Sequence, residues 1–349
     1  MKHVLLPDVR YYKANLHAHS VISDGRTTPE EMKRRYKAHG YSVIAYTDHE
    51  VFLRHNDLTD ENFLAMNGYE VGVYDYDRAT NPKEYRQSHP LCHLCLVALS
   101  PDVDTAVCVN EADVRGNARD HFSEMKTDED AKTYRRVYSA DCINDIIRRA
   151  REAGFFVTYN HPTWSVERYP QYSAYENMHA MEIVNYGCVT EGFPECNDHC
   201  YDDLLDQGKR VFCIATDDNH NKYAEDDPKY DSYGGYTLIA ADRLDYASVA
   251  GALKAGRFYC ATGTPGKEGP KIRSLIFEDD AVTIRAEGAR KIDVQTGIRL
   301  ARSAAAPLGK TIDEARFDLP ENFGWFRVTL TDENGFHAYS NAYFRKDLQ

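Results

Sequence analysis

The sequence lacks features that define several classes of protein. It has no apolar run of about 18 residues, the length that a membrane-spanning helix needs. Its beginning, MKHVLLPDVR, does not resemble a secretory signal peptide. Basic residues are in the minority, 42 Lys and Arg against 55 Asp and Glu, and the formal net charge of −13 repels polyanions. We therefore expect a cytoplasmic protein that binds neither membranes nor long duplex nucleic acid.

Familiar catalytic motifs are also absent. There is no P-loop, no dinucleotide-binding glycine fingerprint and no serine nucleophile elbow. The nine cysteines form no disulfide framework, and neither the CxxC at Cys92 and Cys95 nor the CxxxC at Cys196 and Cys200 has a second pair at zinc-ribbon spacing. We expect reduced, buried thiols. The composition, with 42% hydrophobic and 28% charged residues, is typical of a folded globular protein. The length of 349 residues suggests about two domains.

The first three quarters of the chain alternate between helix and strand patterns. Several predicted helices end at a glycine that is followed at once by a short apolar run. These glycines are Gly40, Gly154, Gly208 and Gly256. Thr28 and Pro29 mark one helix start, with Glu31 placed to close a capping box, and Ser139 and Asp245 are candidate caps of two later helices. Seven or eight strands result, a pattern that predicts an α/β protein with a parallel sheet or barrel.

Two polar segments and one change of pattern interrupt this alternation. Residues 74–90 and 100–138 are too long for ordinary connections between strand and helix, so we expect inserts that act as substrate lids. After the Gly- and Pro-rich stretch at 263–270 only strand patterns remain, such as GWFRVTL. The sequence therefore predicts an α/β domain over 1–262 and a small all-β sandwich over 271–349.

Histidines and acids gather where the predicted strands end. His17 and His19 stand two apart, so both imidazoles point to one face of a strand. Further candidates adjoin later strands: Asp24, His49, Glu70, His93, His161, Asp218 and His220. Each alone is also typical of a structural or surface residue, and Asp217 competes with Asp218. Because strand ends line one shared mouth in α/β folds, we expect the set to meet there.

This donor set predicts a metal centre and hydrolytic chemistry. Imidazole and carboxylate without thiolate suit Zn, Mn or Fe. Water bound by clustered divalent ions loses a proton near neutral pH, and the same ions draw charge from an attacked phosphorus and from the leaving oxygen. Cleavage of a phosphate ester is a natural use of such a cluster.

The series HAH, SDG, TDH, GYE, a strand-opening His, NHP and DNH resembles the PHP (polymerase and histidinol phosphatase) metallohydrolases over residues 10–262. The resemblance implies a distorted (β/α)7 barrel with three divalent metal ions at its mouth. It implies one ion held by His17, His19, Glu70 and Asp218, a second held by Glu70, His93 and His161, and a third held by Asp24, His49 and His220. Within this set it gives catalytic roles to Glu70, Asp218 and His220. The C-terminal part is similar to the sandwich tail of the CehA/McbA-type branch, whereas the insert at 100–138 has no counterpart.

Other residues near these motifs are candidates for contact with a substrate. Arg26 and Lys222 follow SDG and DNH closely and are candidates to bind a phosphoryl group. The alternative, that they are solvated charges on surface loops, is equally compatible with the sequence. Tyr159, Trp164 and Tyr186 adjoin ligand-bearing segments and are candidates to stack on a base or aromatic group, with a core or rim role as the alternative.

Three functions compete at this stage. The first is a metal-dependent phosphoesterase that hydrolyses a small phosphomonoester or phosphodiester, nucleotide-like or a sugar phosphate. The second is a metal-dependent carboxylic or carbamate ester hydrolase, suggested by the resemblance to the CehA/McbA branch. The third is a non-catalytic metal-binding scaffold, which the presence of all nine candidate ligands disfavours.

Overall fold

The computed structural model describes residues 1–74, 89–130 and 132–349. The insert predicted at 74–90 lies outside the described residues except at its ends. Among the described helices, none combines the length and the apolar character needed to cross a membrane.

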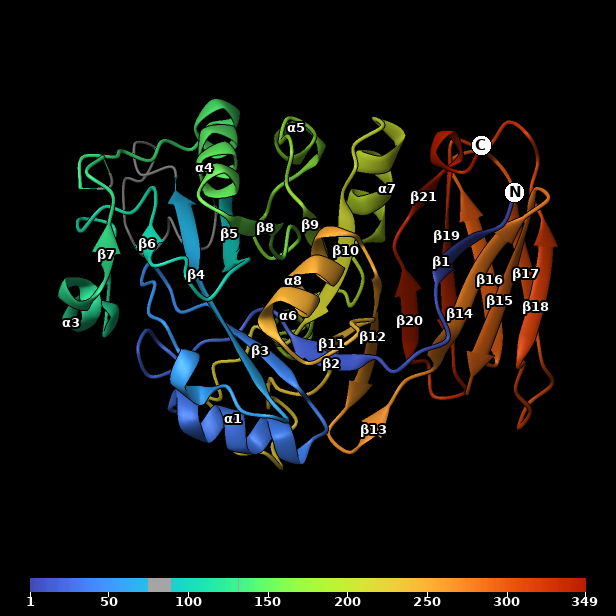
Figure 1. The fold of residues 1–349 in the computed structure, drawn as a ribbon, viewed down its shortest axis with the longest axis horizontal. Helices are drawn as coiled ribbons and strands as arrows, with labels where there is room; N and C mark the ends of the chain where they lie inside the picture. Colours follow the sequence, from blue (N-terminus) through green and yellow to red (C-terminus); the bar gives the residue numbers. More distant parts are fainter. Residues whose placement is uncertain (75–88, 131) are drawn as a thin grey trace.

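A large mixed sheet organises the chain, with helices lying against it (Figure 1). Its first nine strands are β2 (Tyr12–Asn15), β3 (Val43–Tyr46), β4 (Leu64–Tyr74), β5 (Leu91–Ala98), β8 (Phe155–Tyr159), β9 (Ala180–Asn185), β10 (Phe212–Thr216), β11 (Gly235–Ile239) and β12 (Phe258–Thr264). They pair in the order β10-β9-β8-β5-β4-β3-β2-β11-β12. The sheet curls so far that β10 also meets β11, where the Thr237 hydroxyl donates to the Ala215 carbonyl at 3.0 Å.

The helix and glycine signals of the sequence are confirmed. The four longest described helices are α1 (Pro29–Ala38), α4 (Ala140–Glu152), α7 (Asp198–Asp206) and α8 (Tyr246–Lys254). Thr28, Ser139 and Asp245 cap α1, α4 and α8 through side-chain oxygens, and the four predicted glycines all have positive φ. Glu31 differs from expectation, because its carboxylate binds the Arg34 and Arg35 guanidinium groups.

The fold is mixed α/β rather than a regular sevenfold repeat of strand and helix. Strands β2, β3 and β4 are parallel, as are β8, β9 and β10, but β5 runs antiparallel to both β4 and β8. A strand that reverses direction needs no crossover helix. The remaining described helices are single turns: α3 (Ala118–His121), α5 (Tyr169–Tyr172), α6 (Tyr186–Thr190), η1 (Asn56–Leu58), η3 (Phe122–Glu124) and η4 (Arg345–Asp347).

The insert at 100–138 packs into the core, contrary to the expectation of a polar excursion. Besides α3 and η3 it holds the short strands β6 (Thr105–Ala106) and β7 (Lys126–Thr127). Val107 and Val109 are buried, and the Tyr69 hydroxyl binds both the N–H and the carbonyl of Val107 at 2.9 Å. The Arg136 guanidinium is buried in an ion pair with Glu50 at 2.7 Å. Apolar residues scattered among the charges explain the difference, because they join the hydrophobic core of the large sheet.

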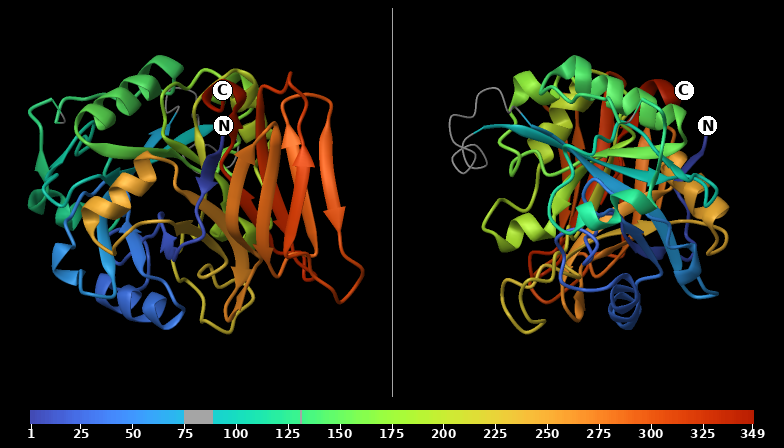
Figure 2. Two further views of the ribbon diagram at one scale, coloured as in Figure 1. Left: turned by 45° about the vertical axis from the view of Figure 1, so that its right-hand side comes forward. Right: turned by 90° about the vertical axis from the view of Figure 1, so that its left-hand side faces the viewer.

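The C-terminal strands build two sheets that face each other (Figure 2). One sheet joins β1 (His3–Leu6) to β14 (Lys271–Glu278), β15 (Ala281–Glu287) and β18 (Glu314–Asp318). The other extends the large sheet through β20 (His337–Ser340), β19 (Trp325–Thr331), β16 (Lys291–Thr296) and β17 (Ala301–Ala305), with β13 (Lys267–Glu268) and β21 (Tyr343–Phe344) at its side. Phe277 and Phe326 stack between the layers with ring centroids 6.0 Å apart.

Hydrogen bonds cross the predicted boundary at 262–271. Strand β12 pairs with β20, so the two segments share one sheet. The Asn341 side chain accepts from the Cys213 N–H at 2.9 Å and donates to two carbonyls near β12, and Arg327 binds Asp202 of α7 with two nitrogens. Strand β1, from the beginning of the chain, belongs to the C-terminal sheet. The C-terminal strands therefore pack as a continuation of the α/β part.

Candidate metal centre

The nine predicted ligands meet at one end of the large sheet. His17 and His19 follow β2, His49 follows β3, His161 follows β8, and Glu70 and His93 lie within β4 and β5. Because β5 is antiparallel, its beginning lies beside the far part of β4, and His93 pairs in register with Gly72. Asp24, Asp218 and His220 come from the loops after β2 and β10. Reversal of β5 thus places His93 beside residues from parallel strands.

A first group joins both histidines of HAH to two carboxylates. Nε2 of His17 lies 3.3 Å from Oε1 of Glu70 and 3.2 Å from Oδ1 of Asp218. Nε2 of His19 lies 3.0 Å from the same Asp218 oxygen and 3.0 Å from Nε2 of His17. The donor atoms of His17, His19 and Asp218 therefore lie within 4.8 Å of one another, as a shared cation requires.

A second group shares Glu70 with the first. Nδ1 of His93 lies 3.1 Å from Oε1 of Glu70, and Nε2 of His161 lies 3.3 Å from the same oxygen. The other carboxylate oxygen, Oε2, lies 3.0 Å from Nδ1 of His49. Glu70 is thus placed between groups of imidazoles, the position of a bridging carboxylate.

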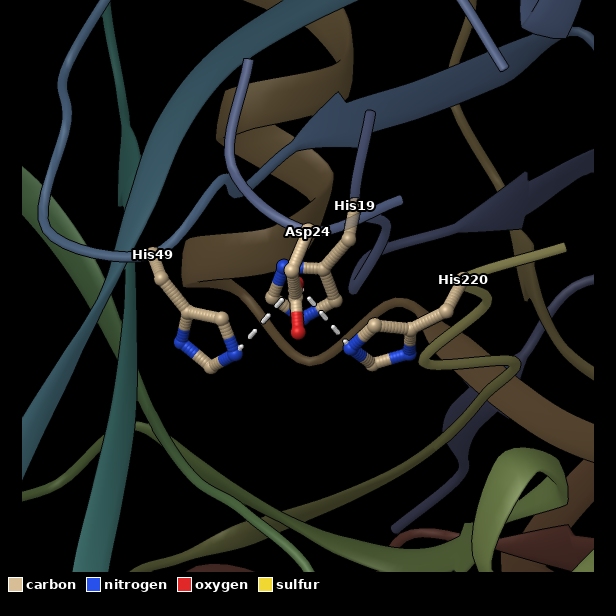
Figure 3. A group of neighbouring side chains, drawn as sticks. All are labelled: His19, Asp24, His49 and His220. Carbon is tan, nitrogen blue, oxygen red and sulfur yellow. Dashed lines mark ion pairs between the residues drawn. The ribbon is translucent and has the colours of Figure 1, made fainter. Parts of the chain in front are cut away.

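The third group, His19, Asp24, His49 and His220, is drawn in Figure 3. Oδ1 of Asp24 lies 3.3 Å from Nε2 of His220 and 3.9 Å from Nε2 of His49. The His19 ring centroid lies 4.3 Å from that of His49 and 4.5 Å from that of His220, and those two centroids lie 6.2 Å apart. His19 was expected in the first group alone, and the structure places it at the junction of both.

The structure separates Asp217 from Asp218. The Asp217 carboxylate points away from the histidines and accepts three backbone N–H groups, from residues 233, 234 and 235, together with the Tyr36 hydroxyl. Burial raises the pKa of Asp217 to about 7, although these hydrogen bonds act against the rise. Only Asp218 faces His17 and His19, so Asp217 is a structural residue.

Sequence reasoning missed Glu182, a buried acid in β9. Its Oε1 lies 2.7 Å from Nδ1 of His17 and accepts from the Thr216 hydroxyl at 2.6 Å. Its Oε2 accepts from the His161 N–H at 2.8 Å. A metal-binding histidine commonly donates its second N–H to such a carboxylate, which fixes its tautomer and orientation. The signal in the sequence was a single acid within the apolar run AMEIVN.

Two further acids hold the loops that carry ligands. Asp48 accepts from the backbone N–H and the hydroxyl of both Ser20 and Ser23, which shapes the loop leading to Asp24. Asp231 accepts from the His220 N–H at 2.7 Å. Asn160 donates to Oε1 of Glu70 at 2.9 Å. These residues position ligands without belonging to the donor groups.

Negative charge dominates the electrostatics of the cluster. Burial acts to lower the pKa of His19, but the Asp218 and Glu70 carboxylates raise it to about 10. Burial together with the positive charge of His19 lowers the pKa of His49 to about 3. Burial would raise the pKa of Glu70, yet the surrounding imidazoles hold it well below its usual range. The buried carboxylates therefore require positive charge nearby, which divalent cations would supply.

Buried polar atoms without hydrogen bonds and strained backbone at two ligands also support a metal centre. Among the described residues, Nδ1 of His19, Oε2 of Glu70 and Nδ1 of His93 are buried with no hydrogen bond of acceptable geometry. His161 and Asp218 adopt positive φ values of 30° and 49°, which side chains other than glycine rarely do. Strain of this kind collects at functional sites. The imidazoles and carboxylates suit Zn, Mn or Fe. Cys95 also lies with His17 and Glu70, but burial raises the pKa of its thiol to about 11, which favours the protonated form.

The cluster opens to solvent at one side. The side chain of Asp24 is 50% exposed and that of His49 27%, whereas that of His17 is 1% exposed. Arg26 and Lys222 are exposed, and the Arg26 backbone N–H donates to the His220 carbonyl at 2.8 Å. Among the described residues neither side chain has an ion-pair partner. Both are therefore available to a ligand.

The three aromatic candidates, Tyr159, Tyr186 and Trp164, lie in different surroundings. Tyr159 is buried, with its hydroxyl 2.6 Å from Oε2 of Glu167, and so is a core residue. Tyr186 is half-buried at the start of α6. Trp164 is half-buried against two ligand imidazoles, with its ring centroid 4.9 Å from that of His161 and 5.8 Å from that of His93. Of the three candidates, only Trp164 has ring contacts with the ligand imidazoles.

No protein-family model and no curated protein matches the sequence. Among solved structures, a two-domain protein of Bacteroides vulgatus with a predicted PHP-like metal-dependent phosphoesterase is 14% identical, with TM-score 0.42, covering 98% of this chain and 97% of that one. A putative metal-dependent phosphoesterase of Bifidobacterium adolescentis is 15% identical, with TM-score 0.37, covering 60% and 88%. An amidohydrolase of Chromobacterium violaceum is 16% identical, with TM-score 0.35, covering 59% and 87%.

Proposed function

We propose that the protein is a metal-dependent hydrolase of the PHP type that cleaves a small phosphomonoester or phosphodiester. The observation that carries this proposal is the convergence of six imidazoles and three carboxylates at one end of the sheet, with Glu70 in contact with His17, His49 and His93. In this proposal the curled sheet is a distorted (β/α)7 barrel, and the C-terminal sheets are a sandwich of the CehA/McbA type.

Three divalent ions, Zn, Mn or Fe, would fit the three groups of donors. The first would be held by His17, His19, Glu70 and Asp218, the second by Glu70, His93 and His161, and the third by Asp24, His49 and His220. When bound, such ions activate water and stabilise the charge that develops on a phosphoryl group. Glu70, Asp218 and His220 would have the catalytic roles as holders of these ions.

The chain itself supplies orientation and access. Glu182 holds Nδ1 of His17, so that Nε2 faces Glu70 and Asp218. Exposure of Asp24 and His49 supports entry of the substrate from that side. Arg26 and Lys222 would bind the phosphoryl oxygens as cations. The net charge of −13 supports a small substrate rather than a long nucleic acid.

Metal analysis and a substrate screen on one preparation test the proposal. We expect about three divalent ions per chain and hydrolysis of phosphomonoesters or phosphodiesters. His17→Ala and His19→Ala should abolish hydrolysis and lower the metal content, whereas the matched variant His121→Ala should retain both. Fewer than two metal sites in metal-replete protein would contradict the mechanism. Turnover of aryl or carbamate esters alone would support the ester hydrolase, and bound metal without any turnover would support the scaffold.

A further inference from the structure

Trp164 stands beside the second donor group without being part of it. Its ring packs edge to face on His161 and lies tilted against His93, the two imidazoles that share Oε1 of Glu70. The indole is half-buried, so part of its surface remains open to solvent. An aromatic surface therefore adjoins the second donor group of the proposed metal centre.

The polar atom of the indole already has a partner. Nε1 of Trp164 donates to Oε2 of Glu191 at 3.0 Å, just beyond α6. This bond fixes the ring and leaves its π face as the chemistry that Trp164 offers to a ligand. The Glu191 carboxylate is exposed beside the ring and would repel a second phosphate group.

The loop that carries Trp164 is braced at several points. Ser165 donates its N–H to the His161 carbonyl at 3.0 Å, and its own carbonyl accepts from Leu91. Glu167 is buried and accepts the hydroxyls of Tyr138, Tyr159 and Tyr175. A ring held in place before binding loses little entropy when a ligand stacks on it.

We propose that Trp164 is a specificity-determining residue, and that the substrate is a monophosphate ester whose leaving group contains a flat aromatic ring, a nucleobase or an aryl group. The proposal rests on the proposed function, because ions held by the donors around Glu70 would bind the phosphoryl group while Trp164 contacts the group attached to it. A saturated leaving group of the same size would lack the stacking contact.

The chain contains two tryptophans, which makes a direct binding test possible. Trp325 lies in β19, buried, with its Nε1 bound to Asp206, so Trp325→Phe leaves Trp164 as the single indole fluorophore. Zn²⁺-reconstituted full-length protein is titrated with phenylphosphonate and with cyclohexylphosphonate, which match in size and charge and resist hydrolysis. We expect phenylphosphonate to change the Trp164 fluorescence and to bind about three- to tenfold more tightly.

Calorimetry on Trp164→Leu and Trp164→Phe completes the test. Leucine should abolish the preference for the phenyl compound and leave the affinity for inorganic phosphate unchanged, whereas phenylalanine should retain most of the preference. Equal binding of the two phosphonates in the parent, or an unchanged preference in Trp164→Leu, would overturn this proposal alone. Failure of inorganic phosphate and of both phosphonates to bind would overturn the proposed function with it.

Discussion

Nδ1 of His17 lies 2.7 Å from Oε1 of Glu182, while Nε2 of the same ring faces Glu70 and Asp218. The contact assigns the proton of the imidazole to the side away from the donor groups. Glu182 also accepts the His161 N–H, so one carboxylate holds residues of two groups. The site thus depends on a residue that is not itself a predicted ligand.

Glu182→Gln is expected to weaken metal binding by about 10- to 100-fold. All four groups that contact the carboxylate are N–H or O–H groups or an imidazole nitrogen, and a glutamine must turn its own N–H₂ toward one pair of them. Metal affinity, measured by competition with a chromophoric chelator, is the check. Wild-type affinity in a variant with unchanged circular dichroism would contradict the role of Glu182.

Asp217→Asn should lower the stability of the fold, whereas Asp218→Asn should lower the metal content. Asp217 accepts three backbone N–H groups, and an amide there leaves a donor facing donors, which costs about 1–3 kcal/mol of folding free energy. Asp218→Asn should instead reduce the metal content with little loss of stability. Urea unfolding and elemental analysis of both variants separate the two roles. Metal loss in Asp217→Asn alone would reverse the assignment.

Removal of metal is expected to destabilise the fold. Glu70 and Asp218 face each other across buried imidazoles, and cations that bind only the folded state stabilise it by mass action, by about 2.7 kcal/mol at 100 times Kd. Addition of a chelator should therefore lower Tm, and excess Zn²⁺ should restore it. The triple variant His17→Ala, His19→Ala, His161→Ala provides the control, since it removes ligands of the first two ions and its Tm should respond less to either addition.

Glu167 should make stability fall as pH rises from about 4.5 to about 7. Burial raises the pKa of Glu167 from 4.5 to about 7, although three tyrosine hydroxyls oppose the rise. In this interval the folded state binds more protons than the unfolded chain, so the free energy of unfolding decreases with pH, by roughly 2–3 kcal/mol in total from this group. Glu167→Gln should remove that part of the slope. Urea unfolding of parent and variant at pH 5 and 8, with chelator present, measures the difference, and identical slopes would contradict it.

Local signals in the sequence were sufficient for much of the fold. Thr28, Ser139 and Asp245 cap helices where predicted, because a cap depends on only a few neighbouring residues. Glycines with positive φ end helices for the same reason. The reversal of β5 could not be predicted, because strand direction is decided by pairing between distant segments.

The sequence by itself determined which residue types stand near strand ends, from HAH to DNH, because these motifs are local patterns. Only the tertiary structure decided which side chains face one another. It turned Asp218 toward His17 and Asp217 toward the backbone of residues 233–235, although the two acids are adjacent in the chain. It also brought Glu182 to His17 across 165 residues of sequence. Such contacts follow from the curvature and pairing of the whole sheet, which set the direction of each side chain and lie beyond the reach of any local motif.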